Sequence, residues 1–168
     1  MIEYLPLVLT GIGIIASILY YASVLRNADN TRRTQLLMDV KKQLDDPKFW
    51  LTLHKIESYK WNNYEEYEEK YGRINNPQAA AEIDALLAFY NSIGVLVATD
   101  RIDVDLLGMH LGPMPVRFWN QFKDVILERR RLNDYPYMYV YFEYLKDEHL
   151  KRVTRPRGKA SYLDKYNR

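Results

Sequence analysis

The chain has 168 residues with a formal net charge of +2, and 48% of its residues are hydrophobic and 14% aromatic. This apolar content is sufficient for a folded core, which excludes an intrinsically disordered chain. Cysteine is absent, which excludes a disulfide framework and is compatible with a reducing compartment.

The first element is an uncharged run over residues 4–25, which as an α-helix would measure about 33 Å, close to the hydrocarbon core of a bilayer. It is apolar on every face and has Tyr4 at one end and Tyr20 and Tyr21 at the other, the usual placing of interfacial aromatic residues. The alternatives are a buried core helix, which is usually shorter and amphipathic, and a signal peptide, which has basic residues in front. Residues 1–25 are therefore predicted to be a transmembrane anchor.

The charges on either side of this run predict its orientation. Arg26, Arg32 and Arg33 follow it, whereas only Glu3 and the terminal amine precede it. Because basic residues are retained on the cytoplasmic side, we expect the N-terminus outside the cell membrane and the C-terminal domain in the cytoplasm. The chain is thus predicted to be a single-pass membrane protein.

Small residues form a stripe on one face of the predicted span. Thr10, Gly13 and Ser17 are spaced three and four residues apart. Such stripes allow two helix backbones to approach closely, so we expect self-association or packing on another span. Neutral packing in lipid is the alternative, because small residues are common in spans.

The remainder of the chain is predicted to be all-α, because apolar residues recur at helical spacing almost throughout. We expect one compact bundle of about four to five helices over residues 26–150, followed by a basic tail over residues 151–168. The first helix should continue directly from the span, since no proline or glycine separates Leu25 from Leu44.

Two helix starts are marked by a capping side chain followed by proline, at Asp46-Pro47 and Asn76-Pro77. The helix that begins at Pro77 is expected at the centre of the bundle because it carries one long apolar stripe. Gly94 on this stripe should permit a close neighbour. The stripe consists of Ile83, Leu86, Leu87, Tyr90, Ile93, Gly94 and Val97.

Three more helices are expected beyond a turn near residues 99–101. A short one surrounds Leu106, and a longer one with Val116, Trp119, Phe122 and Ile126 on one face ends at the sequence ERRRLND. The last segment, YPYMYVYFEYL, alternates like a strand, but no second strand is present to pair with it. We therefore expect a helix, with Met138, Phe142 and Leu145 facing the core.

Familiar catalytic and cofactor-binding motifs are absent from the sequence, including glycine-rich phosphate loops, nucleophile elbows and cysteine nucleophiles. His54 and Glu57 are only a pair of possible metal ligands, and Asp103 begins no calcium loop because Met114 occupies the twelfth position. We expect no cofactor, no metal and no catalysis.

Polar residues on the central helix allow a second hypothesis. Glu82 and Asn91, if buried, must be paired, and Arg117 or Arg129 are the expected partners in a polar core network. The same region gives the alternative of a membrane-tethered enzyme, with a site in the bundle core built from Glu82, Asn91, His110 or Arg117.

Two sets of residues are predicted to contact partners. Trp50, Trp61 and Trp119 would be partner-binding anchors wherever they are exposed, although most are expected in the core. The tail should contact anionic lipid, with nucleic acid as a less favoured partner and a solvated tail as the alternative to both. Its basic residues nearest the domain are Lys151, Arg152, Arg155, Arg157 and Lys159.

The order of these parts, with LLAFYNSIGVLVATDRIDVDLLG followed by FWNQF and ERRR, resembles an uncharacterised family of prokaryotic membrane-anchored helical domains known as a domain of unknown function. The resemblance covers about residues 5–150 and implies the fold and the topology. It implies no activity and no site residue. The sequence as a whole therefore favours a membrane-anchored helical interaction module, either an adaptor or an accessory subunit of a membrane complex.

Overall fold

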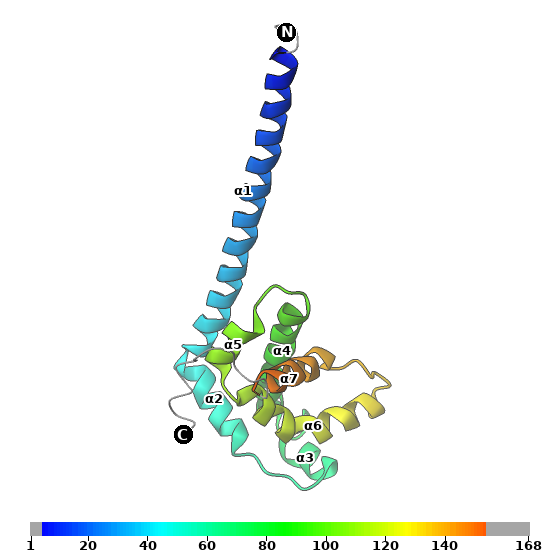
Figure 1. Ribbon diagram of the computed structural model, residues 1–168. Coiled ribbons are helices and arrows are strands. Elements are labelled where there is room, and N and C mark those ends of the chain that lie inside the picture. Colours follow the sequence, from blue (N-terminus) through cyan, green and yellow to red (C-terminus); the bar gives the residue numbers. More distant parts are fainter. Residues whose placement is uncertain (1–4, 154–168) are drawn as a thin grey trace. The chain divides into compact units, whose positions relative to one another are not determined.

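The structure is a computed structural model that describes the backbone of residues 5–153 and the side chains of residues 9–151. The helices of this part are α1 (Leu5–Leu44), α2 (Pro47–Glu57), α3 (Tyr64–Tyr71), α4 (Pro77–Ala98), α5 (Val104–Leu111), α6 (Met114–Leu132) and α7 (Val140–Val153) (Figure 1). The all-α prediction is confirmed, and the described part contains no strand. Within residues 5–153, six helices follow α1 where four to five were expected, because α3 is short and polar and has little apolar periodicity.

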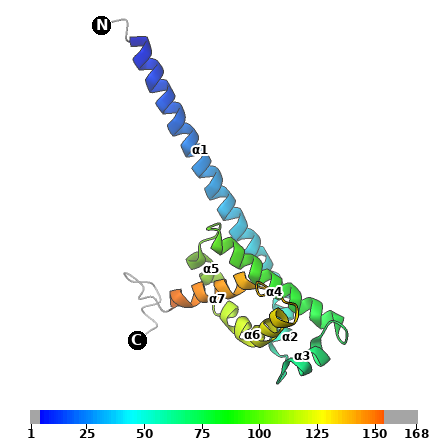
Figure 2. The same cartoon turned by 90° about the vertical axis from the view of Figure 1, so that its right-hand side faces the viewer.

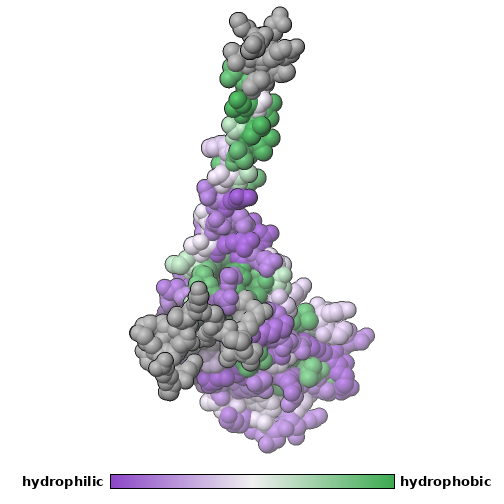
Figure 3. Space-filling model, viewed as in Figure 1, coloured by the Kyte–Doolittle hydropathy of each residue, from purple (hydrophilic) through white to green (hydrophobic). Residues whose placement is uncertain are grey.

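Two compact units make up the chain, residues 1–39 and residues 40–168. The first unit contains α1 as far as Asp39, and residues 40–44 of the same helix belong to the second unit. Helix α1 continues without interruption from the apolar run, as predicted. None of residues 9–39 is buried. On the face that Figure 3 shows, apolar residues (green) cover the upper coloured part of this helix and hydrophilic residues (purple) follow further along it.

Two described helices, α1 from Leu9 and α4, are long and apolar enough to cross a membrane. They differ in burial: 0% of the most apolar stretch of α1 is buried inside the structure, whereas 44% of the corresponding stretch of α4 is buried. The apolar stripe of α4, from Ile83 to Val97, is buried as predicted. The composition of α4 is therefore explained by its position at the centre of the second unit.

The closest helix pair of the second unit is α4 with α7, which lie side by side (Figure 2). A Cβ atom added to Gly94 would collide with the backbone carbonyl of Tyr141, so the absence of a side chain permits the contact, as expected. Phe142 stacks on Tyr90 with ring centroids 5.0 Å apart, and Phe118 of α6 completes this aromatic layer 5.3 Å from Tyr90. Large aromatic rings thus form the core between α4, α6 and α7.

Both predicted helix starts are confirmed. Asp46 accepts a hydrogen bond from the backbone N–H of Lys48 at 2.9 Å, and Asn76 accepts one from Ala79 at 3.1 Å. Pro47 and Pro77 stand in the first turn of α2 and α4, where a missing N–H costs nothing.

The segment YPYMYVYFEYL forms a helix as predicted, except at its beginning. Helix α7 begins at Val140, and residues 136–139 form turns, with Tyr139 in the left-handed region at φ 54°. Met138 therefore precedes the helix, and its carbonyl accepts a hydrogen bond from Arg130 at 2.9 Å. Phe142 and Leu145 are buried as expected. The start of α7 is set by tertiary contacts that the alternating tyrosines do not reveal.

Candidate functional site

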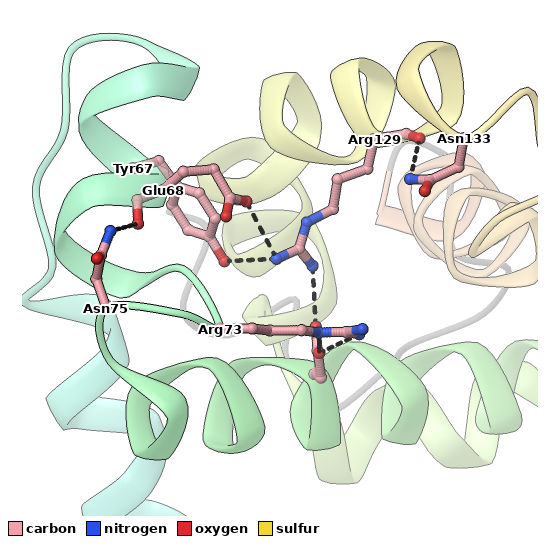
Figure 4. Close-up of polar contacts among 7 residues, drawn as sticks. Tyr67, Glu68, Arg73, Asn75, Arg129 and Asn133 are labelled. Carbon is pink, nitrogen blue, oxygen red and sulfur yellow. Dashed lines mark hydrogen bonds and ion pairs between the residues drawn. The ribbon is translucent and has the colours of Figure 1, made fainter.

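The most extensive polar cluster surrounds the guanidinium group of Arg129 on α6 (Figure 4). Its Nη1 donates to Asp84 Oδ1 on α4 at 2.9 Å, and its Nη2 lies 3.4 Å from the Tyr67 hydroxyl and 3.6 Å from Glu68 Oε1 on α3. Arg73 donates to the second oxygen of Asp84 at 2.7 Å. One guanidinium group thus joins α3, α4 and α6.

The electrostatics of this cluster favour a fixed charge state. Arg129 is only 8% exposed; burial lowers the pKa of its guanidinium, but Tyr67 and Asp84 raise that pKa by more, so that the net pKa lies above its ordinary value. Burial also raises the pKa of the Tyr67 phenol. Two cationic and two carboxylate side chains balance one another, and both Tyr67 and Arg129 keep their protons near neutrality. The cluster is suited to clamping helices rather than to proton transfer.

The predicted network of Glu82, Asn91, Arg117 and Arg129 is only partly correct. Arg129 is buried and paired, but its partners come from α3 and α4 and do not include Glu82 or Asn91. Sequence reasoning missed Tyr67, Glu68, Arg73 and Asp84. The available signal was Asp84, an acidic residue beside the buried Ile83 on a largely apolar helix, where a carboxylate needs a cationic partner.

Glu82 is half-buried on α4, and its partners are not the predicted arginines. It forms an ion pair with Lys55 on α2 at 2.7 Å and accepts from Gln78 at 3.1 Å. The hydrogen bond from Lys55 lowers the pKa of the Glu82 carboxyl. Glu82 also lines an open groove of about 420 Å³ between α2 and α4, the other lining residues being Gln43, Asp46, Lys48, Phe49, Thr52, Ala81, Ala85 and Leu86.

Asn91 has a structural role between α4 and α7. Its side-chain oxygen accepts hydrogen bonds from the backbone N–H groups of Tyr141 and Phe142, both at 3.2 Å. Both donors lie in the first turn of α7, whose N–H groups have no partner within the helix, and the N–H of Phe142 also donates to the carbonyl of Tyr139 at 3.1 Å. Asn91 therefore caps α7 from a neighbouring helix.

Arg117 belongs to a separate cluster where α2, α4 and α6 meet. Its Nη2 lies 3.0 Å from Glu57 Oε1, and Glu57 Oε2 lies 3.4 Å from Nδ1 of His54. Glu57 and Arg117 are also the charged neighbours of the buried Tyr90 hydroxyl, which has no hydrogen-bond partner among the described residues. Burial is the main cause of the raised pKa of this phenol. His110 is exposed on α5 and is not part of the cluster.

The four residues of the enzyme hypothesis are therefore not brought together. Glu82 pairs with Lys55, Asn91 caps α7, and Arg117 pairs with Glu57. In the described part of the chain, no group of three or more histidine, cysteine, aspartate or glutamate side chains is placed to hold a metal ion.

The tryptophans contribute to the fold. Trp119 is 3% exposed and meets Phe142 edge-on at 5.2 Å. Trp50 is half-buried and donates to the carbonyl of Leu44 at 2.6 Å, while Trp61 is half-buried and lies 5.1 Å from the ring of Phe122. The large apolar side chains most exposed on the second unit belong to other positions, namely Leu51, Ile74, Met109 and Tyr137.

The small-residue stripe of α1 is exposed. The Ser17 hydroxyl donates to the carbonyl of Gly13 at 2.8 Å, and a Cβ atom at Gly13 would meet nothing within 4 Å. In the basic tail, Lys151 forms an ion pair with Glu148 at 2.6 Å. The side chains of Arg152, Arg155, Arg157 and Lys159 lie outside the described residues.

Comparison with known proteins gives one positive result. A family model described as a domain of unknown function (DUF4760) matches residues 7–148. No curated protein and no solved structure matches.

Proposed function

We propose that this chain, which belongs to the DUF4760 family, is a membrane-anchored helical interaction module that serves as an adaptor or accessory subunit of a membrane complex. The proposal rests on the exposure of α1. Its most apolar stretch is 0% buried, although the second unit has an apolar core of its own. An apolar stretch that the fold does not bury is explained by a bilayer around it.

The polar side chains of the second unit support a binding role over a catalytic one. Arg129, Asn91 and Glu82 each join two or more helices, so their hydrogen-bonding capacity is used for the fold. Exposed apolar side chains on the same unit, such as Met109 at 80% and Ile74 at 95% exposure, are available to a protein partner. A second candidate is anionic lipid, which the basic residues 151–168 would contact from a position held near the membrane.

Purification from membranes tests the proposal. The tagged full chain, expressed at native level, is extracted in mild detergent and analysed for co-purifying proteins and for particle size. We expect a self-associated particle, or at least one stoichiometric partner protein that a tagged α1 segment alone does not retain. Recovery of the chain as a lone monomer would contradict the interaction role.

The lipid contact has its own test. Flotation of the 27–168 fragment is measured with neutral and with anionic vesicles at low and high salt, beside a fragment that ends at Leu150. Binding that requires anionic lipid, weakens with salt and is lost on truncation supports the contact. Equal binding of both fragments, or of neither, argues against it.

A further inference from the structure

The stripe of small residues on α1 is the beginning of a longer uncharged seam. From Thr10, Gly13 and Ser17 the alternating spacing of three and four residues continues through Tyr20 and Val24. This is the spacing of the two core positions of a heptad repeat, at which two helices meet in a left-handed pair. The membrane part of α1 thus presents one heptad face.

The same seam continues beyond the apolar run, where α1 carries charges. It passes through Asn27, Thr31, Thr34 and Met38, none of which is charged or buried. The positions that flank the seam in a heptad, residues 28, 30, 35 and 37, are uncharged as well. All the charged residues of the 26–39 segment fall on the outer positions of the repeat, and they are Arg26, Asp29, Arg32, Arg33 and Asp39.

This distribution of charge is what a pair of identical parallel helices requires. Copies of one membrane protein insert with the same orientation, so two spans pair in parallel and identical residues face each other across the seam. A charged residue there would meet its own like charge. A partner of different sequence does not impose this restriction, and the charge-free seam therefore favours a second copy of the chain.

The hydroxyl groups along the seam already have hydrogen-bond acceptors within α1. The hydroxyl of Ser17 donates to Gly13 at 2.8 Å, that of Thr31 to Asn27 at 2.9 Å and that of Thr34 to Asn30 at 3.0 Å, each to a backbone carbonyl of the same helix. Because these donors are satisfied, the hydroxyl groups can be covered by a second helix without an unpaired proton.

We propose that two copies of the chain pair through α1, in parallel and in register, along a seam from Thr10 to Met38. The inference rests on the proposed membrane anchoring and specifies a second copy as one partner. Small residues in the span allow close approach, and the span holds the two juxtamembrane segments at high effective concentration. Pairing also accounts for the juxtamembrane helix, which an isolated segment of this length would form only marginally in water.

Cysteine cross-linking in native membranes tests the seam, because the natural chain contains no cysteine. Asn27→Cys, Thr31→Cys and Thr34→Cys are compared with Arg32→Cys and Leu36→Cys on the outer face, each in the full chain. After oxidation, disulfide-linked dimer is measured on non-reducing gels. We expect about fivefold or more dimer from the seam variants, since only facing cysteines approach within bonding distance. Equal yields on the two faces, or no dimer at any position, would overturn the proposal.

Two glycines provide a matched pair for the span itself. Gly13 lies on the seam and Gly11 does not, and an added Cβ atom at either position meets nothing within 4 Å of the same chain. In the Thr31→Cys chain, Gly13→Ile should reduce the dimer severalfold, whereas Gly11→Ile should leave its yield unchanged. Equal effects of the two substitutions would contradict pairing through this face.

Membrane fractionation of the same samples distinguishes failure of the proposed membrane anchoring from failure of the proposed pairing through α1. A chain that resists alkaline extraction but shows no face-dependent cross-linking overturns the pairing and leaves the anchoring intact. A chain recovered in the soluble fraction overturns both.

Discussion

Individual residues in the second unit mainly determine how its helices meet. Arg129 joins three helices through Asp84, Tyr67 and Glu68, and Gly94 allows the backbone of α7 to approach α4. We expect substitutions at both positions to destabilise the fold. Arg129 buries a charge together with its partners, and Gly94 has no room for a side chain.

Replacing Arg129 by methionine should destabilise the domain by about 3 kcal/mol, because it leaves Asp84 partly buried with only Arg73 as an ionic partner. The free energy of unfolding is measured with a denaturant. Arg131→Met is the matched control, since the Arg131 side chain is 68% exposed and pairs only with Glu128 on its own helix. Similar stabilities of the two variants would show that the cluster is not a clamp.

The substitution Gly94→Ala should lower the melting temperature more than an ordinary surface change, because the new methyl group collides with the Tyr141 carbonyl and forces α7 away from α4. Ser92→Ala on the exposed face of the same helix is the control. Thermal unfolding followed by circular dichroism distinguishes the two. A Gly94→Ala protein as stable as the control would mean that α7 moves freely.

The helix starts of this chain are capped in two ways, by a neighbouring residue in the sequence or by a side chain of another helix. Asp46 and Asn76 cap α2 and α4 from the preceding residue, a purely local arrangement. Helix α7 instead receives its cap from Asn91 on α4, fifty residues earlier in the chain. Local starts are visible in a sequence, and a cap supplied from a distance is not.

The neighbouring residues Asp45 and Asp46 allow a test of the local cap. Asp46→Ala should cost about 1 kcal/mol of stability, since the N–H of Lys48 loses its acceptor. Asp45→Ala removes the same charge next to the cap position and should have a smaller effect. Chemical denaturation of both variants measures the difference, and equal losses would assign the effect to charge alone.

At the scale of the whole molecule, α1 is a helix of 40 residues whose first part is apolar, and it leads into a unit with its own aromatic core. The boundary at residue 39 separates two units that have most of their contacts within themselves. The predicted boundary at residue 25 marks the end of the apolar run, so the two boundaries describe different properties. The intervening segment is polar and helical, and it carries the charges from which the orientation is predicted.

Protease protection tests that orientation. In sealed inside-out membrane vesicles, added protease should digest the second unit, and in right-side-out vesicles it should leave this unit intact. These outcomes follow from the proposed orientation, in which the side of α1 with Arg26, Arg32 and Arg33 faces the cytoplasm. A soluble domain known to lie in the cytoplasm serves as the control. The opposite pattern would reverse the proposed topology.

Periodicity and capping signals in the sequence by themselves determined the helical class, the continuous α1, the two proline-marked helix starts and the buried stripe of α4. These features depend on residues within one or two helical turns of one another, so their spacing along the chain is sufficient. The partners of Arg129, the surface position of Glu82, the capping by Asn91 and the start of α7 at Val140 were decided only by the tertiary structure. Each of them joins residues from different helices, and the rotation of one helix against another is set by the packing of the whole core.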